Sequence, residues 1–173
     1  KPDGVLSATE DPAQKTVLDL LPPELRHLGM FPVGRLDKDT TGLLILTNDG
    51  ALCHEATSPR HHVDKVYAFT VDGMLTQEDA EALAAGVELR DGTVCRSAQL
   101  TIDPDEPTRG TLAISEGKYH QVKRMLAARG KHVLMLERLS MGGLTLDPAL
   151  APGACRELTE TETALLLQKK VTV

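Results

Sequence analysis

Residues 34–50 read GRLDKDTTGLLILTNDG, a glycine-bounded turn that leads into an apolar run. The turn contains Asp37, two residues after Arg35. The run from Leu43 to Thr47 predicts a fully buried strand, and Asn48-Asp49-Gly50 predicts a turn after it. A reactive side chain is well held on an accessible turn that a rigid element braces. The stretch therefore predicts a carboxylate presented at the start of a buried strand.

Asp37 is the first candidate for chemistry. A carboxylate can act as a covalent nucleophile, and a nearby cation favours its ionised form. The spacing alone fits a plain surface ion pair between Asp37 and Arg35 equally well. Asp39 and Asp49 are interpreted as turn or capping carboxylates, since Asp side chains satisfy their own backbone in such places.

The rest of the chain predicts short helices and strands in alternation. The expected helices run from Thr16 to Leu21 before Pro22-Pro23, from Thr76 to Gly86, from His120 to Arg129, and from the capping box at Thr159 to Lys170. The further strands are Lys65 to Val71, Ala98 to Ile102, Thr111 to Ser115 and Val133 to Leu136. Because strands outnumber helices and short turns join most neighbours, we expect an α+β fold with a largely antiparallel sheet.

Composition limits the class of protein. A chain of 173 residues suits one domain, and its only aromatic residues are two Tyr and two Phe. The three cysteines lie far apart without a CxxC pair, which favours free thiols in a reducing compartment. We find no apolar run near 18 residues and no signal-peptide pattern, so we expect a soluble, cytoplasmic protein away from membranes. A monomer is the default expectation.

The net charge and the distribution of charge along the chain point in different directions on nucleic-acid binding. The net charge of −6 argues against strong nucleic-acid binding. Residues 117–138, however, carry six Lys or Arg residues against the single acidic Glu137. A basic patch on an acidic body can still bind RNA locally.

Three further groups of residues could carry function. Tyr67 lies within a strand and is read either as half-buried core or as a ring that stacks on a base. The motif at residues 116–125, EGKYHQVKRM, leads a glycine turn into a helix whose first turns carry cations, which fits an anion site or a solvated basic face. His61 and His62 are adjacent, so their side chains diverge; we expect no metal site there and favour an RNA-facing or solvent-exposed loop.

Taken together and in this order, these motifs resemble the RsuA-type pseudouridine synthases, which isomerise uridine in ribosomal RNA. The resemblance covers nearly the whole chain, from Lys1-Pro2-Asp3-Gly4 through residues 34–50, 58–62, 65–67 and 114–125 to residues 150–159. The runs at residues 58–62 and 119–125 are more similar to the enzymes of the small subunit than to their relatives that act on the large subunit or on tRNA.

The resemblance implies a mixed, mostly antiparallel sheet in two subdomains, flanked by helices, with the active site in the cleft between them. It implies Asp37 as the catalytic aspartate, Tyr67 as the active-site tyrosine and Lys123 as the basic residue that pairs with Asp37. Many relatives have Arg at that position, so either Lys123 or Arg124 could make the contact. The expected RNA-binding residues are Arg35, Arg60, His61, His62, Lys118, His120, Gln121 and Arg124.

The resemblance also bears on cofactors and partners. It implies chemistry without a metal, nucleotide or redox cofactor, on ribosomal RNA within an assembling small subunit. Relatives usually carry an S4-like RNA-binding domain before the catalytic part; here residues 1–173 read as the catalytic domain alone, and the start at Lys1 suggests a fragment of a longer protein. Competing readings are a large-subunit target, a catalytically idle RNA-binding or assembly factor, and an aspartyl-nucleophile hydrolase, which would lack its usual second carboxylate or metal.

Overall fold

The computed structural model describes residues 1–58 and 60–167. The helices are η1 (Val17–Leu20, a 3-10 helix), α1 (Pro23–Arg26), α2 (Gly50–Thr57), α3 (Gln77–Ala85), α4 (Gln121–Ala128) and α5 (Glu160–Leu166). The strands are β1 (Phe31–Pro32), β2 (Thr41–Gly42), β3 (Leu46–Thr47), β4 (Lys65–Val71), β5 (Gln99–Ile102), β6 (Arg109–Ile114), β7 (Val133–Met141) and β8 (Leu144–Thr145).

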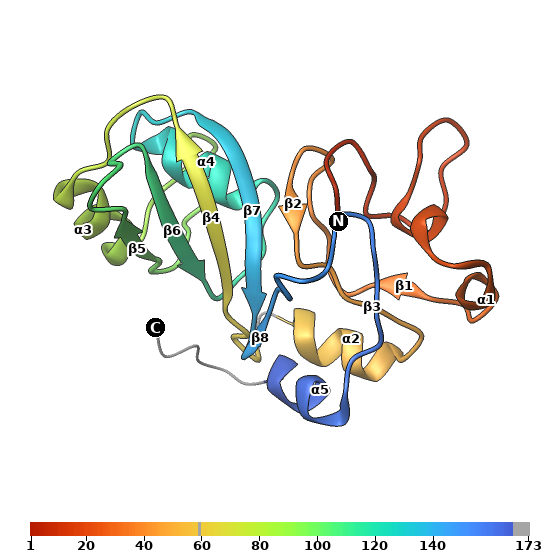
Figure 1. Ribbon diagram of the computed structural model, residues 1–173. Coiled ribbons are helices and arrows are strands. Elements are labelled where there is room, and N and C mark those ends of the chain that lie inside the picture. Colours follow the sequence, from red (N-terminus) through yellow and green to blue (C-terminus); the bar gives the residue numbers. More distant parts are fainter. Residues whose placement is uncertain (59, 168–173) are drawn as a thin grey trace.

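A six-stranded sheet organises the molecule (Figure 1). Its order is β2-β7-β4-β6-β5, and β8 pairs with β7. Only the β2–β7 pair among these is parallel; the others are antiparallel. A separate small sheet pairs β1 with β3. The expected mixed, mostly antiparallel α+β fold is confirmed.

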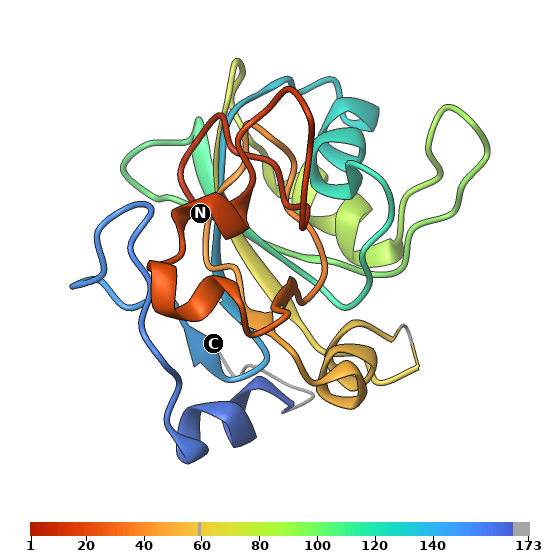
Figure 2. The same ribbon diagram turned by 90° about the vertical axis from the view of Figure 1, so that its right-hand side faces the viewer.

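Two hydrophobic clusters correspond to the two subdomains. The first lies between the sheet and the helices α3 and α4, around Phe69, Leu83, Leu112 and Met125. The second includes Val33, Ala56, Met141 and Leu166. In both views α2 and α5 lie at the same end of the molecule, near β8 (Figures 1 and 2). The long strand β7 contributes Leu136 to the first cluster and Met141 to the second, so it joins the two.

Most predicted elements form where local signals placed them. Strand β4 has the predicted bounds, and α3 begins with a capping box between Thr76 and Asp79 and ends at Gly86. Helix α4 buries Val122, Met125 and Leu126 as its spacing predicts. Thr159 also caps α5 through a capping box; the predicted continuation to Lys170 lies outside the described residues.

The predicted strand from Leu43 to Thr47 is wrong. After β2 the chain leaves the large sheet, and only Leu46 and Thr47 are strand residues, paired with β1. Within the apolar run Ile45 is buried, whereas Leu43, Leu44 and Leu46 are half-buried. The change of sheet needs Gly42, whose φ is +102° and where a Cβ atom would collide with the carbonyl oxygen of Arg138.

The structure adds two helices to the predicted elements and lengthens one predicted strand, and the capping role predicted for Asp49 is confirmed. Asp49 caps an unpredicted helix, α2, by accepting bonds from the amides of Ala51 and Leu52. Pro23 does not only end the preceding helix but also begins α1, because its fixed φ suits a first helical position. Strand β7 extends well past Leu136, since pairing with β4 supports it as far as Met141.

Candidate active site

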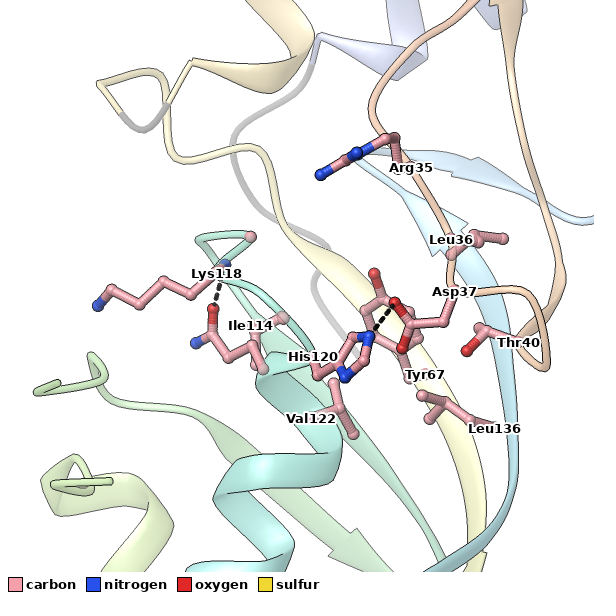
Figure 3. Close-up of a pocket in the computed structure, with 12 residues that line it drawn as sticks. Arg35, Leu36, Asp37, Thr40, Tyr67, Ile114, Lys118, His120, Val122 and Leu136 are labelled. Carbon is pink, nitrogen blue, oxygen red and sulfur yellow. Dashed lines mark hydrogen bonds and ion pairs between the residues drawn. The ribbon is translucent and has the colours of Figure 1, made fainter. Parts of the chain in front are cut away.

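Asp37 lies in the turn between β1 and β2, and its side chain points toward His120 at the start of α4 (Figure 3). The amide of Thr40 donates to the Asp37 carbonyl at 3.0 Å and closes the turn. The Lys1 Nζ donates to the carbonyls of Lys38 and Thr40 at 2.9 and 2.8 Å. Side-chain bonds of this kind hold the turn where a sheet ladder does not.

A serine fixes the residue that precedes Asp37. The buried Ser7 Oγ accepts from the Leu36 amide at 3.0 Å and donates to the Leu36 carbonyl at 2.9 Å. Both backbone groups of Leu36 are thus satisfied by one hydroxyl. The direction in which Asp37 leaves the backbone is set by this contact.

The carboxylate of Asp37 meets the start of α4. Lys123 Nζ lies 3.2 Å from Asp37 Oδ2. His120 Nε2 lies 3.4 Å from Asp37 Oδ1, a contact that Figure 3 shows as a dashed line. Arg124 turns the other way and pairs with Asp91. Lys123, and not Arg124, is therefore the cationic partner of Asp37.

Lys123 is shared between two carboxylates. Its Nζ lies closer to Asp39 Oδ1, at 2.6 Å, than to Asp37. Burial lowers the pKa of Lys123, but its hydrogen bonds to Asp39 and Asp37 outweigh that effect and leave this pKa raised. The hydrogen bond from Lys123 in turn holds the pKa of Asp39 below its usual value. Asp39 therefore orients the lysine and does not merely close a turn.

A pocket opens beside Asp37. Its lining comes from the catalytic turn, the sheet and the start of α4: Arg35, Leu36, Asp37, Thr40, Tyr67, Ile114, Gly117, Lys118, His120, Gln121, Val122 and Leu136. Tyr67 of β4 lies in it with Asp37 and His120, over apolar side chains of Ile114 and Leu136 (Figure 3). The pocket thus combines an aromatic ring, a carboxylate and cations over an apolar floor.

The buried carboxylate of Glu116 supports the loop before α4. Glu116 accepts from the Arg96 amide at 2.9 Å, from Gln121 Nε2 at 2.7 Å and from Lys118 Nζ at 2.9 Å. Burial raises the pKa of Glu116, but these hydrogen bonds outweigh it and leave this pKa lowered. Gln121, expected to contact RNA, is instead buried in this network. We did not single out Glu116 from the sequence; its place two residues before a cation in the motif was the available signal.

The structure divides the expected RNA-binding residues into two groups. Arg35, Lys118, His120 and Gln121 line the pocket, whereas Arg60, His61, His62 and Arg124 do not. His62 contacts Arg96, with 2.6 Å between His62 Nδ1 and Arg96 Nη1, and His61 Nδ1 lies 2.9 Å from the Glu55 carbonyl oxygen. Pro59, within the range 58–62 that carries part of the resemblance, lies outside the described residues.

Within residues 1–58 and 60–167, no three or more His, Cys, Asp and Glu side chains are grouped so that they could hold a metal ion. No helix in that part of the chain has the length and apolar character needed to cross a membrane.

Comparison with known proteins agrees with this geometry. Residues 1–128 match the family described as RNA pseudouridylate synthase. The chain is 51% identical to YtzG of Bacillus subtilis, named an uncharacterized RNA pseudouridine synthase, over 96% of this chain and 70% of that protein. It is 46% identical to the ribosomal small subunit pseudouridine synthase A of Escherichia coli K12, over 95% of this chain and 70% of that protein.

Solved structures give the same fold. A crystal structure of a pseudouridylate synthase superposes with a TM-score of 0.89 at 38% identity, over 96% of this chain and 70% of that one. An archaeal Nop10–Cbf5 complex of the box H/ACA sRNP shares the fold alone, with a TM-score of 0.57 at 16% identity, over 87% of this chain and 48% of that one.

Proposed function

This chain belongs to the RNA pseudouridylate synthase family, and from that premise we propose that it isomerises one uridine of small-subunit ribosomal RNA to pseudouridine. The observation that carries the proposal is the pocket in which Asp37 lies 3.2 Å from Lys123 and shares its lining with Tyr67. The relative of 46% identity named for the ribosomal small subunit supports the choice of RNA.

The reaction exchanges one bond to the ribose for another. The N1–C1′ bond of uridine breaks, the uracil turns, and a C5–C1′ bond forms; the ring then loses its C5 proton and N1 gains one. The uridine must first leave its stack, at a cost of a few kcal/mol. Stacking on Tyr67 and contacts from Arg35 and Lys118 would offset that cost.

Asp37 is assigned as the catalytic carboxylate. It can attack the sugar, attack the ring, or assist departure of the uracil, and each route needs the carboxylate ionised and aimed at the bound nucleotide. Lys123 pairs with this carboxylate and fixes its direction. Tyr67 would take or relay the C5 proton, with its ring against the uracil.

Partners and location follow from the substrate. We propose that the substrate is ribosomal RNA within an assembling small subunit. The enzyme would act on it in the cytoplasm as a monomer. The Arg60 to His62 loop, outside the pocket, would contact RNA away from the target uridine.

The proposal is tested by mapping pseudouridine in small-subunit rRNA from cells with and without the gene, using carbodiimide-dependent stops of reverse transcription. We expect one modified site to disappear in the deletion and to return with the wild-type gene but not with Asp37→Asn. Loss of a site from large-subunit rRNA instead would support the same reaction but assign it to the other ribosomal RNA. Unchanged maps of both RNAs would contradict the proposal and favour an idle RNA-binding factor.

A further inference from the structure

Tyr119 is an exposed aromatic residue at the edge of the pocket. Its exposed fraction is 70%, and its chain neighbours Lys118 and His120 both line the pocket. The chain has two Tyr and two Phe in all, and Phe69 is in the core at 1% exposure. A scarce aromatic ring is thus placed in solvent beside the site, where burial does not explain it.

The ring of Tyr119 is stacked on the ring of His120. Their centroids lie 3.8 Å apart, and their planes meet at 19°. Side chains of adjacent residues normally diverge; here His120 adopts the left-handed conformation, with φ 46° and ψ 37°, and brings the two rings together. Such a conformation is unfavourable for a residue with a Cβ atom, and residues held in it concentrate at functional sites.

The backbone under this ring pair is tied down. The Lys118 amide donates to Gln121 Oε1 at 2.8 Å, and Gln121 is itself buried. Arg124 Nη1 donates to the Tyr119 carbonyl at 3.2 Å, and the Arg124 amide donates to the His120 carbonyl at 2.9 Å. An exposed ring on a fixed backbone loses little entropy when a second ring stacks on it.

We propose that the outer face of Tyr119 stacks the unpaired nucleobase next to the target uridine. The inference rests on the proposed function, because extruding a uridine leaves its neighbour without a stacking partner on one side. The ring of Tyr119 replaces that partner, and the stack continues through His120, whose Nε2 lies 3.4 Å from Asp37. The exposed Arg35 and the half-buried Lys118 line the same pocket and supply positive charge for the flanking phosphates.

The test measures binding of single-stranded RNA of about 12 nucleotides that carries one uridine and, beside it, the fluorescent base 2-aminopurine. Base–aromatic stacking predicts that Tyr119→Leu raises the dissociation constant between about 5- and 150-fold. Tyr119→Phe keeps the ring and should stay within about twofold of wild type. Met74→Ala, another exposed apolar side chain (65% exposed) outside the pocket lining, is the matched control.

Two further readouts exclude a merely structural role of the ring. Wild type and Tyr119→Phe should change the 2-aminopurine emission on binding, and Tyr119→Leu should not. An abasic nucleotide in place of that base should weaken binding to wild type but add little to Tyr119→Leu, since both changes remove one stack. Thermal unfolding of each variant checks that α4 still forms.

The outcomes separate this inference from the proposed function. Unchanged affinity of Tyr119→Leu, equal effects of the abasic site on both proteins, or no binding by wild type would overturn the stacking. Each of these is a binding measurement and needs no turnover. Failure of the wild type to form pseudouridine in ribosomal RNA would overturn the proposed function while these measurements still decide on Tyr119.

Discussion

The two sides of the pocket are built in different ways. Tyr67 stands on β4, which pairs along its length with both β6 and β7. Asp37 stands on a turn between strands of two residues each, held by bonds from the side chains of Lys1 and Ser7. A sheet ladder positions the first residue and a few side-chain contacts position the second. The position of Asp37 should therefore depend on single residues far more than that of Tyr67 does.

Lys123 on α4 is the cation paired with Asp37, so its removal should have the largest effect of any change other than one to Asp37 itself. Lys123→Met keeps the length of the side chain but removes the charge 3.2 Å from Asp37. We expect kcat to fall about 10²- to 10³-fold, the loss typical of removing one preorganised electrostatic contact. Steady-state kinetics on ribosomal RNA measures this, with RNA affinity determined separately. Equal losses of kcat and affinity would make Lys123 a phosphate contact instead.

Lys65 lies on β4, so it tests the side of the pocket that the sheet builds, close to the second hydrophobic cluster. It is 8% exposed, and its strand partners are Ile114 of the first cluster and Met141 of the second. Burial lowers its pKa from 10.5 to about 8, with Arg138 adding to the effect. Between these values the unfolded chain holds a proton that the folded chain lacks, so stability rises with pH.

The change that tests this is Lys65→Met, with Lys65→Arg as a control that keeps its charge throughout. From pH 7.5 to 10 the unfolding free energy of wild type should rise by about 2 kcal/mol relative to either variant. Urea denaturation at several pH values measures it. A difference that stays flat over this range would show that Lys65 is not held in a low-polarity site.

A matched pair of hydroxyls sharpens the comparison with smaller effects. Ser7→Ala leaves the amide and carbonyl of Leu36 without their partner and should cost about 1.5 kcal/mol of stability. Because Leu36 precedes Asp37, we also expect kcat to fall about tenfold. Thr76→Ala removes the cap of α3 and should cost about 1 kcal/mol with kcat unchanged. Denaturation and kinetics on both variants test this; equal effects on kcat would contradict the comparison.

The same contrast explains what the sequence could predict. Strand β4 and helices α3 and α4 carry periodic and capping signals that act within a few residues, so their bounds were close to correct. The run at residues 43–47 looked like one buried strand because apolar composition does not record which sheet a residue joins. Gly42, just before this run, allows a close approach to the backbone of Arg138. The sequence shows the glycine but not the neighbour that requires it.

The sequence predicts which residues form the candidate site better than it predicts how they contact one another. Asp37, Tyr67 and His120 line one pocket, and Lys123 rather than Arg124 faces Asp37. Contacts between residues distant in sequence, such as Ser7 with Leu36 or Lys123 with Asp39, leave no local pattern. Such contacts form only when the fold brings distant segments of the chain together.

The most direct test of the account compares Asp37→Asn with Asp39→Asn, two carboxylates that share Lys123 but differ in access to the pocket. Purified variants would be given small-subunit ribosomal RNA, and pseudouridine would be quantified by nucleoside mass spectrometry, with thermal unfolding as a check on folding. We predict at least about a 10³-fold loss of product for Asp37→Asn and a loss of no more than about tenfold for Asp39→Asn. Appreciable product from a folded Asp37→Asn enzyme, or equal losses in both variants, would contradict the assignment of Asp37 as the catalytic carboxylate.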